Sequence, residues 1–151
     1  MAKVRKADIR DESELMQLCR ELHEENGLFT MYEDLVRANL RHAFMNNGGV
    51  IGVIGEPGKM EAAIYIKLGT FWYSDQLHLE ELFVFVRPEF RKSSNAKDLI
   101  TFAKKCSEEL NIPLVTGIIT NERTEAKVRL YERQFPKKAG AFFLYNSKFN
   151  H

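Results

Sequence analysis

The residue types with the clearest capacity for chemistry follow one another between positions 77 and 96. A strand is expected over residues 77–86, and it carries two adjacent carboxylates, Glu80 and Glu81. A carboxylate beside a reacting group can act as a general base and remove its proton. Because adjacent residues of a strand face opposite sides of the sheet, only one of the two is expected to point into a given site.

The loop that follows this strand has the features of an anion site. Pro88 ends the strand because it offers no backbone donor, and Ser93 or Ser94 can cap the next helix. The first turn of a helix presents unpaired N–H groups and the positive end of its dipole. Four cations lie nearby, at Arg87, Arg91, Lys92 and Lys97. A phosphate-bearing ligand fits this chemistry, although spacing alone also fits a solvated, capped helix start, which is the commoner structure.

The elements that must position these residues follow a mixed α/β order. Strands are expected over residues 3–7, 50–54, 62–68, 77–86, 114–120 and 141–148. Helices are expected over residues 11–26, 32–44 and 122–134, with a further helix from the serine cap to about residue 110. Asp11, with Glu14 three residues later, predicts the start of the first helix. A Pro-Gly turn at 56–59 predicts an antiparallel hairpin between the second and third strands.

Two motifs in this frame resemble a known family. The run Val86-x-Pro88-Glu89-Phe90-Arg91-x-x-Ser94-x-Ala96 is similar to the central motif V-x-P-x-Y-R-x-x-G-x-G/A of the GNAT superfamily of N-acetyltransferases. Asn121 after a strand and Leu130-Tyr131-Glu132-Arg133 near a helix end resemble the family's N…LYEK signature. The order of elements also fits over almost the whole chain. The resemblance implies the GNAT acyl-CoA N-acyltransferase fold, a mostly antiparallel twisted sheet flanked by helices, in a single domain over residues 1–151.

The resemblance also implies an activity and its co-substrate. An acetyl group would pass from acetyl-CoA directly to a primary amine of a small molecule or protein, with no metal and no covalent enzyme intermediate. The motif loop would hold the pyrophosphate of acetyl-CoA, and backbone groups of two strand residues would hold its pantetheine arm and thioester carbonyl. The implied cofactor-binding residues are Val84, Val86, Arg91, Lys92, Ser93, Ser94, Asn95, Ala96 and Asn121.

The implied catalytic residues are a base and an acid. In the family, a glutamate base lies on this strand about eleven residues before the Arg91 position, which selects Glu80. A bulge in the strand, common in the family, would turn Glu81 inward instead. His78 shares the face of Glu80 and is the reserve base. Tyr131 takes the position of the acid that reprotonates coenzyme A.

The acceptor side is less defined by the sequence. Phe29, Tyr32, Trp72 and Tyr73 either form an aromatic wall for the acceptor or cover a small core. The acidic run Glu21, Glu24 and Glu25 is interpreted as a solvated helix face that is also able to attract a cationic amine.

Departures from the family pattern keep two other functions open. Ser94 and Lys92 replace glycines, and a Cβ there restricts the approach of the backbone to a pyrophosphate. Gln134-Phe135-Pro136 stands where the family has a glycine-aromatic pair, so the acceptor side is either cut down or completed by a second subunit in a homodimer. The alternatives are a non-catalytic acyl-CoA-binding or protein-interaction module, and a peptide- or protein-binding inhibitor using Phe71-Trp72-Tyr73.

The composition excludes several classes of protein. A chain of 151 residues, with 44% apolar and 28% charged residues, fits one ordinary globular domain. Its formal charge of +1 offers no field that would recruit nucleic acid or an anionic membrane. No Cys/His spacing resembles a zinc site, and Cys19 and Cys106 lie away from the predicted site. No apolar run suits a signal peptide or a membrane span, so a cytoplasmic location with reduced thiols is expected.

Overall fold

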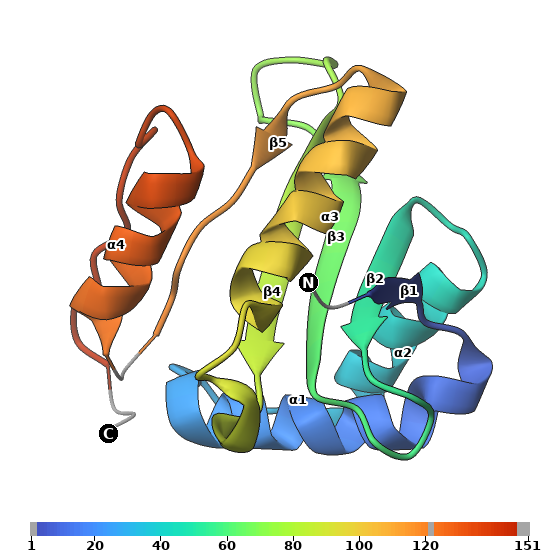
Figure 1. Cartoon of the computed structure of the whole chain (residues 1–151). Coiled ribbons are helices and arrows are strands. Elements are labelled where there is room, and N and C mark those ends of the chain that lie inside the picture. Colours follow the sequence, from blue (N-terminus) through green and yellow to red (C-terminus); the bar gives the residue numbers. More distant parts are fainter. Residues whose placement is uncertain (1–2, 121–122, 148–151) are drawn as a thin grey trace.

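The computed structural model describes residues 3–120 and 123–147, and its elements follow the expected mixed α/β order (Figure 1). The strands are β1 (Val4–Lys6), β2 (Gly49–Ile54), β3 (Ala62–Gly69), β4 (His78–Val86) and β5 (Leu114–Val115). The helices are α1 (Glu12–Asn26), α2 (Glu33–Phe44), α3 (Asn95–Leu110) and α4 (Thr124–Gln134), with short 3-10 turns at Ile9–Asp11 and Pro88–Phe90.

The five strands form one mostly antiparallel sheet in the order β1-β2-β3-β4-β5. Neighbouring strands from β1 to β4 run antiparallel, which confirms the predicted hairpin between β2 and β3. The last pairing is parallel and short, because β5 meets β4 only through Leu79↔Leu114 and Glu80↔Val115. The sheet therefore has one edge at which β4 is covered over only part of its length.

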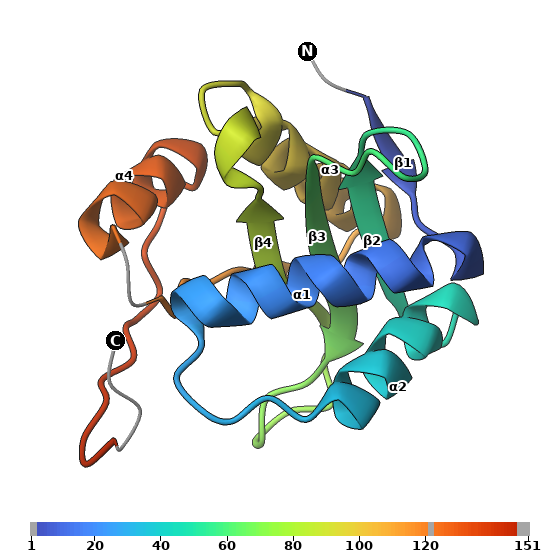
Figure 2. The same ribbon diagram turned by 90° about the horizontal axis from the view of Figure 1, so that it is seen from below.

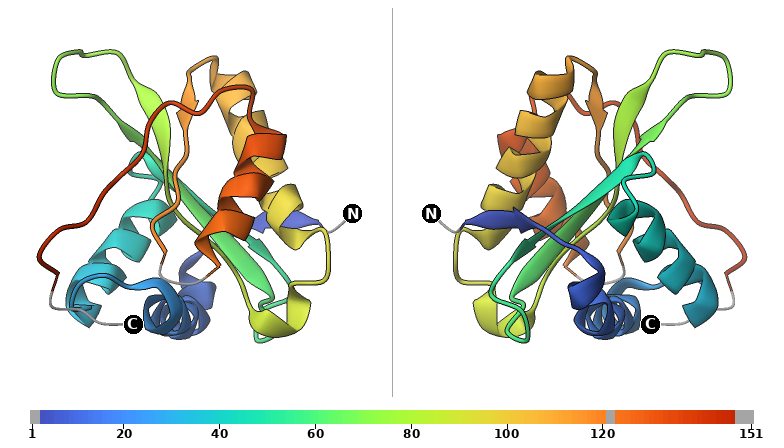
Figure 3. Two further views of the ribbon diagram at one scale, coloured as in Figure 1. Left: turned by 90° about the vertical axis from the view of Figure 1, so that its left-hand side faces the viewer. Right: turned by 90° about the vertical axis from the view of Figure 1, so that its right-hand side faces the viewer.

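Helices cover both faces of the sheet. Figure 2 shows α1 running across the strands with α2 beside it, and Figure 3 shows α3 and α4 on the opposite side. Two buried clusters result, one under α1 and α2 that contains Cys19, and one under α3 against which Cys106 packs. Both thiols are free, and a disulfide between them is ruled out because the sheet lies between the two clusters.

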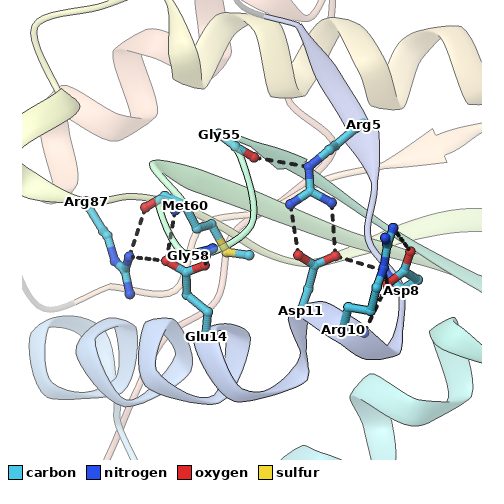
Figure 4. Close-up of polar contacts among 9 residues, drawn as sticks. All are labelled: Arg5, Asp8, Arg10, Asp11, Glu14, Gly55, Gly58, Met60 and Arg87. Atoms are coloured by element: carbon cyan, nitrogen blue, oxygen red, sulfur yellow. Dashed lines mark hydrogen bonds and ion pairs between the residues drawn. The ribbon is translucent and has the colours of Figure 1, made fainter.

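The predicted start of α1 is confirmed, because Asp11 is the N-cap residue of this helix. The Asp11 side chain makes no capping hydrogen bond to α1, and the reciprocal capping bonds lie three residues earlier, between Asp8 and Asp11 in the 3-10 turn. The backbone N–H of Asp8 donates to Asp11 Oδ2 at 3.0 Å, and Asp8 Oδ1 accepts from the N–H of Arg10 at 2.9 Å. The buried Asp11 carboxylate also accepts two hydrogen bonds from the Arg5 guanidinium at 2.8 and 3.0 Å (Figure 4). This contact ties the first helix to the first strand.

Arg87 takes a structural role rather than a place in the expected cation cluster. Its guanidinium donates to Glu14 at 3.3 Å, to Glu21 at 3.1 Å and to the carbonyl oxygen of Met60 at 2.8 Å. Figure 4 shows the Glu14 and Met60 contacts between α1 and the β2–β3 turn. Because Arg87 is mostly buried and its charge is paired with two carboxylates, it holds α1 against the end of β4.

Replacing Arg87 by glutamine is expected to lower the free energy of unfolding by about 3 kcal/mol, because two carboxylates would lose their shared cation in a partly buried site. Urea unfolding followed by circular dichroism measures this. The matched control is Arg133→Gln at an exposed position of α4, for which a change within about 0.5 kcal/mol is expected. Equal effects of the two substitutions would contradict the role given to Arg87.

The C-terminal half departs most from the expected elements. The predicted strand over residues 114–120 ends after two residues, because the chain then turns away from β4 and loses its hydrogen-bonding partner (Figure 1). The predicted closing strand is absent over residues 141–147, where Phe142, Phe143 and Tyr145 are exposed. Its last position, Lys148, lies outside the described residues, as does residue 122 at the expected start of the last helix. Within the described residues, every helix is too short or too polar to cross a membrane.

Candidate active site

A cavity of about 620 Å³ opens where β5 turns away from β4. One wall is β4 from His78 to Val86, and the facing wall is the chain over residues 115–120 together with the inner face of α4. The end of α1 and the start of α3 complete the boundary, at Glu25 and Ala96 respectively. This volume lies within the range of small-molecule and cofactor sites. The short β4–β5 pairing is thus what creates the site.

The uncovered edge of β4 supplies backbone groups to the cavity. The N–H of Arg87 donates to the carbonyl of Glu61 beside β3, and hydrogen-bonding directions alternate along an antiparallel strand. The polar backbone groups of Val84 and Val86 therefore face the open edge, where both residues line the cavity. The carbonyl oxygen of Val86 accepts a hydrogen bond from Arg91 Nε at 2.8 Å. These are the two strand residues that the resemblance assigned to the cofactor.

A bulge in β4 decides which glutamate faces α4. Phe83 pairs with Tyr65 and Glu81 pairs with Ile66, so Leu82 is an extra residue between them. Without that residue, alternation from Phe83 would leave Glu81 on the face of α1. The bulge moves Glu81 to the face that holds Ile66 and α4, as the resemblance allowed.

Glu81 and Tyr131 form a hydrogen-bonded pair inside the cavity. The Tyr131 hydroxyl, carried by α4, donates to Glu81 Oε1 at 2.7 Å. Burial raises the pKa of the Glu81 carboxyl to about 7, and the hydrogen bond from Tyr131 opposes part of that rise. Burial and the neighbouring carboxylate raise the pKa of Tyr131 well above 10. The structure thus brings together the predicted acid and the second of the two candidate bases.

Glu80 lies on the other face of β4, next to the predicted reserve base. Its Oε2 is 3.2 Å from Nε2 of the buried His78. The carboxyl group packs against Gly69, where an added Cβ would come within 2.8 Å of it. Its side chain is 38% exposed, and both Glu80 and His78 line the cavity. Glu80 is therefore held at the cavity, and its contacts there are with His78 and Gly69 rather than Tyr131.

The side chains of the motif loop are largely engaged with the protein. Arg91 pairs with Glu25 at 2.7 Å and lies 5.4 Å from the centre of the Phe85 ring. Asn95 is buried, and its Nδ2 donates to Glu61 Oε1 at 3.0 Å. These two side chains shape the wall of the site.

The start of α3 keeps backbone donors for an anion. The Ser93 hydroxyl accepts from the N–H of Asn95 at 3.1 Å, and the Ser94 hydroxyl donates to Asp98 Oδ2 at 2.7 Å. Within the described residues, the N–H groups of Ser94 and Ala96 make no hydrogen bond. Lys92 and Lys97 are exposed beside them. The other implied cofactor residue, Asn121, lies outside the described residues.

Sequence reasoning missed the role of the end of α1. Glu25, interpreted as part of a solvated face, receives ion pairs from Arg91 and from Lys127 of α4, the latter at 3.5 Å. Burial works against ionisation here, but these two cations hold the pKa of Glu25 below its usual value. Lys127 Nζ also donates to Asn26 at 3.0 Å. No spacing rule links position 25 to position 127, so only the fold reveals this contact.

Comparison with known proteins gives fold-level matches. No protein-family profile and no curated protein matches the sequence. Among solved structures, AAC(6')-Iy in complex with the bisubstrate analogue CoA-S-monomethyl-acetylneamine has a TM-score of 0.75 at 12% identity, with 99% of each chain covered. A ribosomal-protein-alanine N-acetyltransferase from Brucella melitensis biovar Abortus 2308 has a TM-score of 0.70 at 14% identity, covering 97% of this chain and 99% of that one.

A third match comes from the mobile metagenome of Cole Harbour Salt Marsh. This integron cassette protein, HFX_CASS3, has a TM-score of 0.73 at 21% identity, covering 98% of this chain and 91% of that one. The matches span nearly the full length of each chain at low identity. They establish the fold alone.

Proposed function

We propose that this chain, which has the fold of the GNAT N-acetyltransferases, transfers an acetyl group from acetyl-CoA directly to a primary amine of a small molecule or protein. The observation that carries the proposal is the Glu81–Tyr131 pair, a carboxyl with a pKa of about 7 hydrogen-bonded to a tyrosine within one cavity. A base of that pKa operates near neutral pH, where general base catalysis is most efficient. A single domain over residues 1–151 suffices for this proposal.

The co-substrate would lie along the uncovered edge of β4. Backbone groups of Val84 and Val86 would receive the pantetheine arm and polarise the thioester carbonyl. The N–H groups of Ser94 and Ala96 would bind the pyrophosphate at the start of α3, with Lys92 adding charge. Support comes from the solved structures of AAC(6')-Iy, which was determined with coenzyme A and with a coenzyme A conjugate.

The proposed reaction moves two protons from the acceptor nitrogen. Glu81 takes one proton from the ammonium group and passes it to solvent, which leaves a nitrogen lone pair for attack on the thioester carbonyl. The N–C bond then forms, the C–S bond breaks with its electron pair on sulfur, and the second proton passes to Glu81. Tyr131 gives its proton to the sulfur and recovers one from Glu81 across their 2.7 Å hydrogen bond. The products are an amide, the free thiol of coenzyme A and one released proton.

The cysteines support direct transfer. Burial raises the pKa of the Cys19 thiol to about 11 and also raises that of Cys106, so neither thiol is activated as a nucleophile. Neither residue lines the cavity. An acetyl-cysteine intermediate is therefore not part of the proposal.

Two assays on the same preparation test the proposal. Calorimetry is expected to show one-site binding of coenzyme A, and a thiol-release assay with acetyl-CoA and a panel of primary amines is expected to show amine-dependent turnover. Binding without turnover for any amine would favour the acyl-CoA-binding module instead. No binding at millimolar coenzyme A would contradict both functions.

A further inference from the structure

We infer that the acceptor is a primary amine with one positive charge on an aromatic or similarly flat apolar body, and that Phe71, Tyr73 and Trp72 bind that body. The inference rests on the proposed acetyl transfer and names its substrate class. It begins from a set of rings in the β3–β4 loop that packing of the core does not explain.

Four rings contact one another in series from the cavity to the surface, and this series is here called the aromatic stack. Its inner member is the buried ring of His78, whose centre is 4.7 Å from that of Phe71 at an interplanar angle of 27°. Phe71 stacks on Tyr73 at 6.0 Å and 11°, and Tyr73 meets the edge of Trp72 at 5.5 Å and 83°. His78 and Phe71 line the cavity, so the inner end of the aromatic stack lies in the same cavity as the carboxylates of Glu80 and Glu81.

Exposure rises along the aromatic stack. Phe71 is 48% exposed, Tyr73 71% and Trp72 94%. Neighbouring exposed aromatic rings on a soluble protein commonly mark a binding surface, because they gain little from the protein's own core. Phe142, from the segment after α4, lines the same cavity and is also exposed. Aromatic surface thus borders the cavity from two distant parts of the chain.

The charges of the cavity fit a single ammonium group. In the described part of the chain, three carboxylates and three cations line it: Glu25, Glu80, Glu81, Arg91, Arg123 and Lys127. Glu25 is paired with Arg91 and Lys127, and Glu81 is bonded to Tyr131. Glu80, whose side chain is 38% exposed beside His78 at the inner end of the aromatic stack, forms no ion pair with an Arg or Lys of the described residues and can attract an incoming ammonium group. A polycation would need several such carboxylates.

The chemistry of the rings agrees with an acceptor whose charge lies at a carboxylate and whose apolar body lies against the aromatic stack. Indole and phenol rings attract flat apolar groups and also cations, with Trp the strongest of them. An amine that places its charge near Glu80 would bring its body against Phe71 and Tyr73. The same ammonium nitrogen would then move on to Glu81, which lines the same cavity and removes its proton.

Trp72 is the only tryptophan of the chain, so its fluorescence reports binding at the aromatic stack without any need for turnover. Titration with 2-phenylethylamine at pH 7 is expected to give a saturable change in Trp72 emission. The dissociation constant is expected to be at least about tenfold lower than for butylamine, which lacks a ring, or for spermidine, a polycation. 2-Phenylethanol, which lacks the charge, is expected to bind more weakly than 2-phenylethylamine.

Two alanine variants test whether 2-phenylethylamine binds at the aromatic stack. Phe71→Ala, in an exposed loop, is expected to weaken 2-phenylethylamine binding at least about fivefold. Ile9→Ala, at a similarly exposed apolar position in the 3-10 turn before α1, is the matched control and is expected to leave the affinity unchanged. Equal affinity for spermidine or butylamine, or an unchanged affinity in Phe71→Ala, would overturn the inference.

The two proposals can fail separately. If coenzyme A does not bind but 2-phenylethylamine saturates the Trp72 signal, the proposed acetyl transfer is wrong and the amine site stands. If coenzyme A binds and spermidine is acetylated in preference to 2-phenylethylamine, acetyl transfer stands and the substrate class inferred here is wrong.

Discussion

Glu81→Gln is expected to lower kcat for acetyl transfer by about 100- to 10,000-fold, the usual contribution of a general base. Glutamine keeps the size of the side chain and can still accept the Tyr131 hydrogen bond, but it cannot take a proton from the acceptor. The measurement is the rate of thiol release with acetyl-CoA and an amine at pH 7.5, with coenzyme A binding checked on the same sample. Unchanged binding with lost turnover is the expected combination.

The matched control is the neighbouring substitution Glu80→Gln. It is expected to keep kcat within about tenfold and to raise the KM of the amine, because an exposed charge partner contributes about 1 kcal/mol or less. The two substitutions change adjacent residues in the same chemical way. If Glu80→Gln abolished turnover and Glu81→Gln did not, the base would be Glu80, and the role assigned to the Glu81–Tyr131 pair would be wrong.

The same Glu81→Gln substitution is expected to raise the free energy of unfolding at pH 8 by about 3 kcal/mol, because the pKa of Glu81 differs between the folded and the unfolded chain. In the folded chain the pKa of Glu81 is about 7, against 4.5 for an unperturbed glutamate side chain. The folded state therefore holds this proton more tightly than the unfolded state. Stability is lost as the pH rises from about 4.5 to about 7, and the loss stays constant above that range. The glutamine side chain does not ionise in this pH range, so the variant does not undergo this loss of stability.

Urea unfolding at pH 4 and at pH 8 measures this effect. At pH 4 the carboxyl is protonated in both states, and the two proteins are expected to differ by less than about 1 kcal/mol. Glu80→Gln, at a more exposed carboxyl, is expected to show no comparable gain at pH 8. A Glu81→Gln variant that is less stable than the wild type at pH 8 would show that burial of the ionised Glu81 carboxylate does not destabilise the folded state.

Local patterns predicted most of the scaffold. The apolar spacing of α1, α2 and α3 and the Pro-Gly turn between β2 and β3 are signals within one segment, and the structure confirms those elements. Tyr131 was predicted to be a site residue near a helix end through the family signature, and the structure places it on α4 at the cavity. Signals that lie within one element, or within one motif, were therefore sufficient for these features.

Features that depend on distant partners were not predicted. The choice between Glu80 and Glu81 rests on the extra residue Leu82, and the register of β4 against β3 creates that bulge without a local signal. The chain after β5 has a strand-like sequence but lacks a neighbouring strand to bond with. Arg87 was expected among the phosphate-facing cations, but its partners Glu14 and Glu21 lie more than sixty positions away.

The pH dependence of kcat/KM tests the central claim most directly, because it reports the pKa of the base in the free enzyme. For an acceptor that binds as an ammonium ion, log kcat/KM is expected to rise with unit slope and level off at about pH 7, the pKa of Glu81. In Tyr131→Phe the break, which is the pH at which the profile levels off, is expected to move to higher pH, because the lost hydrogen bond had lowered the pKa of Glu81. A break that stays at the same pH in both Glu81→Gln and Tyr131→Phe would contradict the assignment of Glu81 as the base.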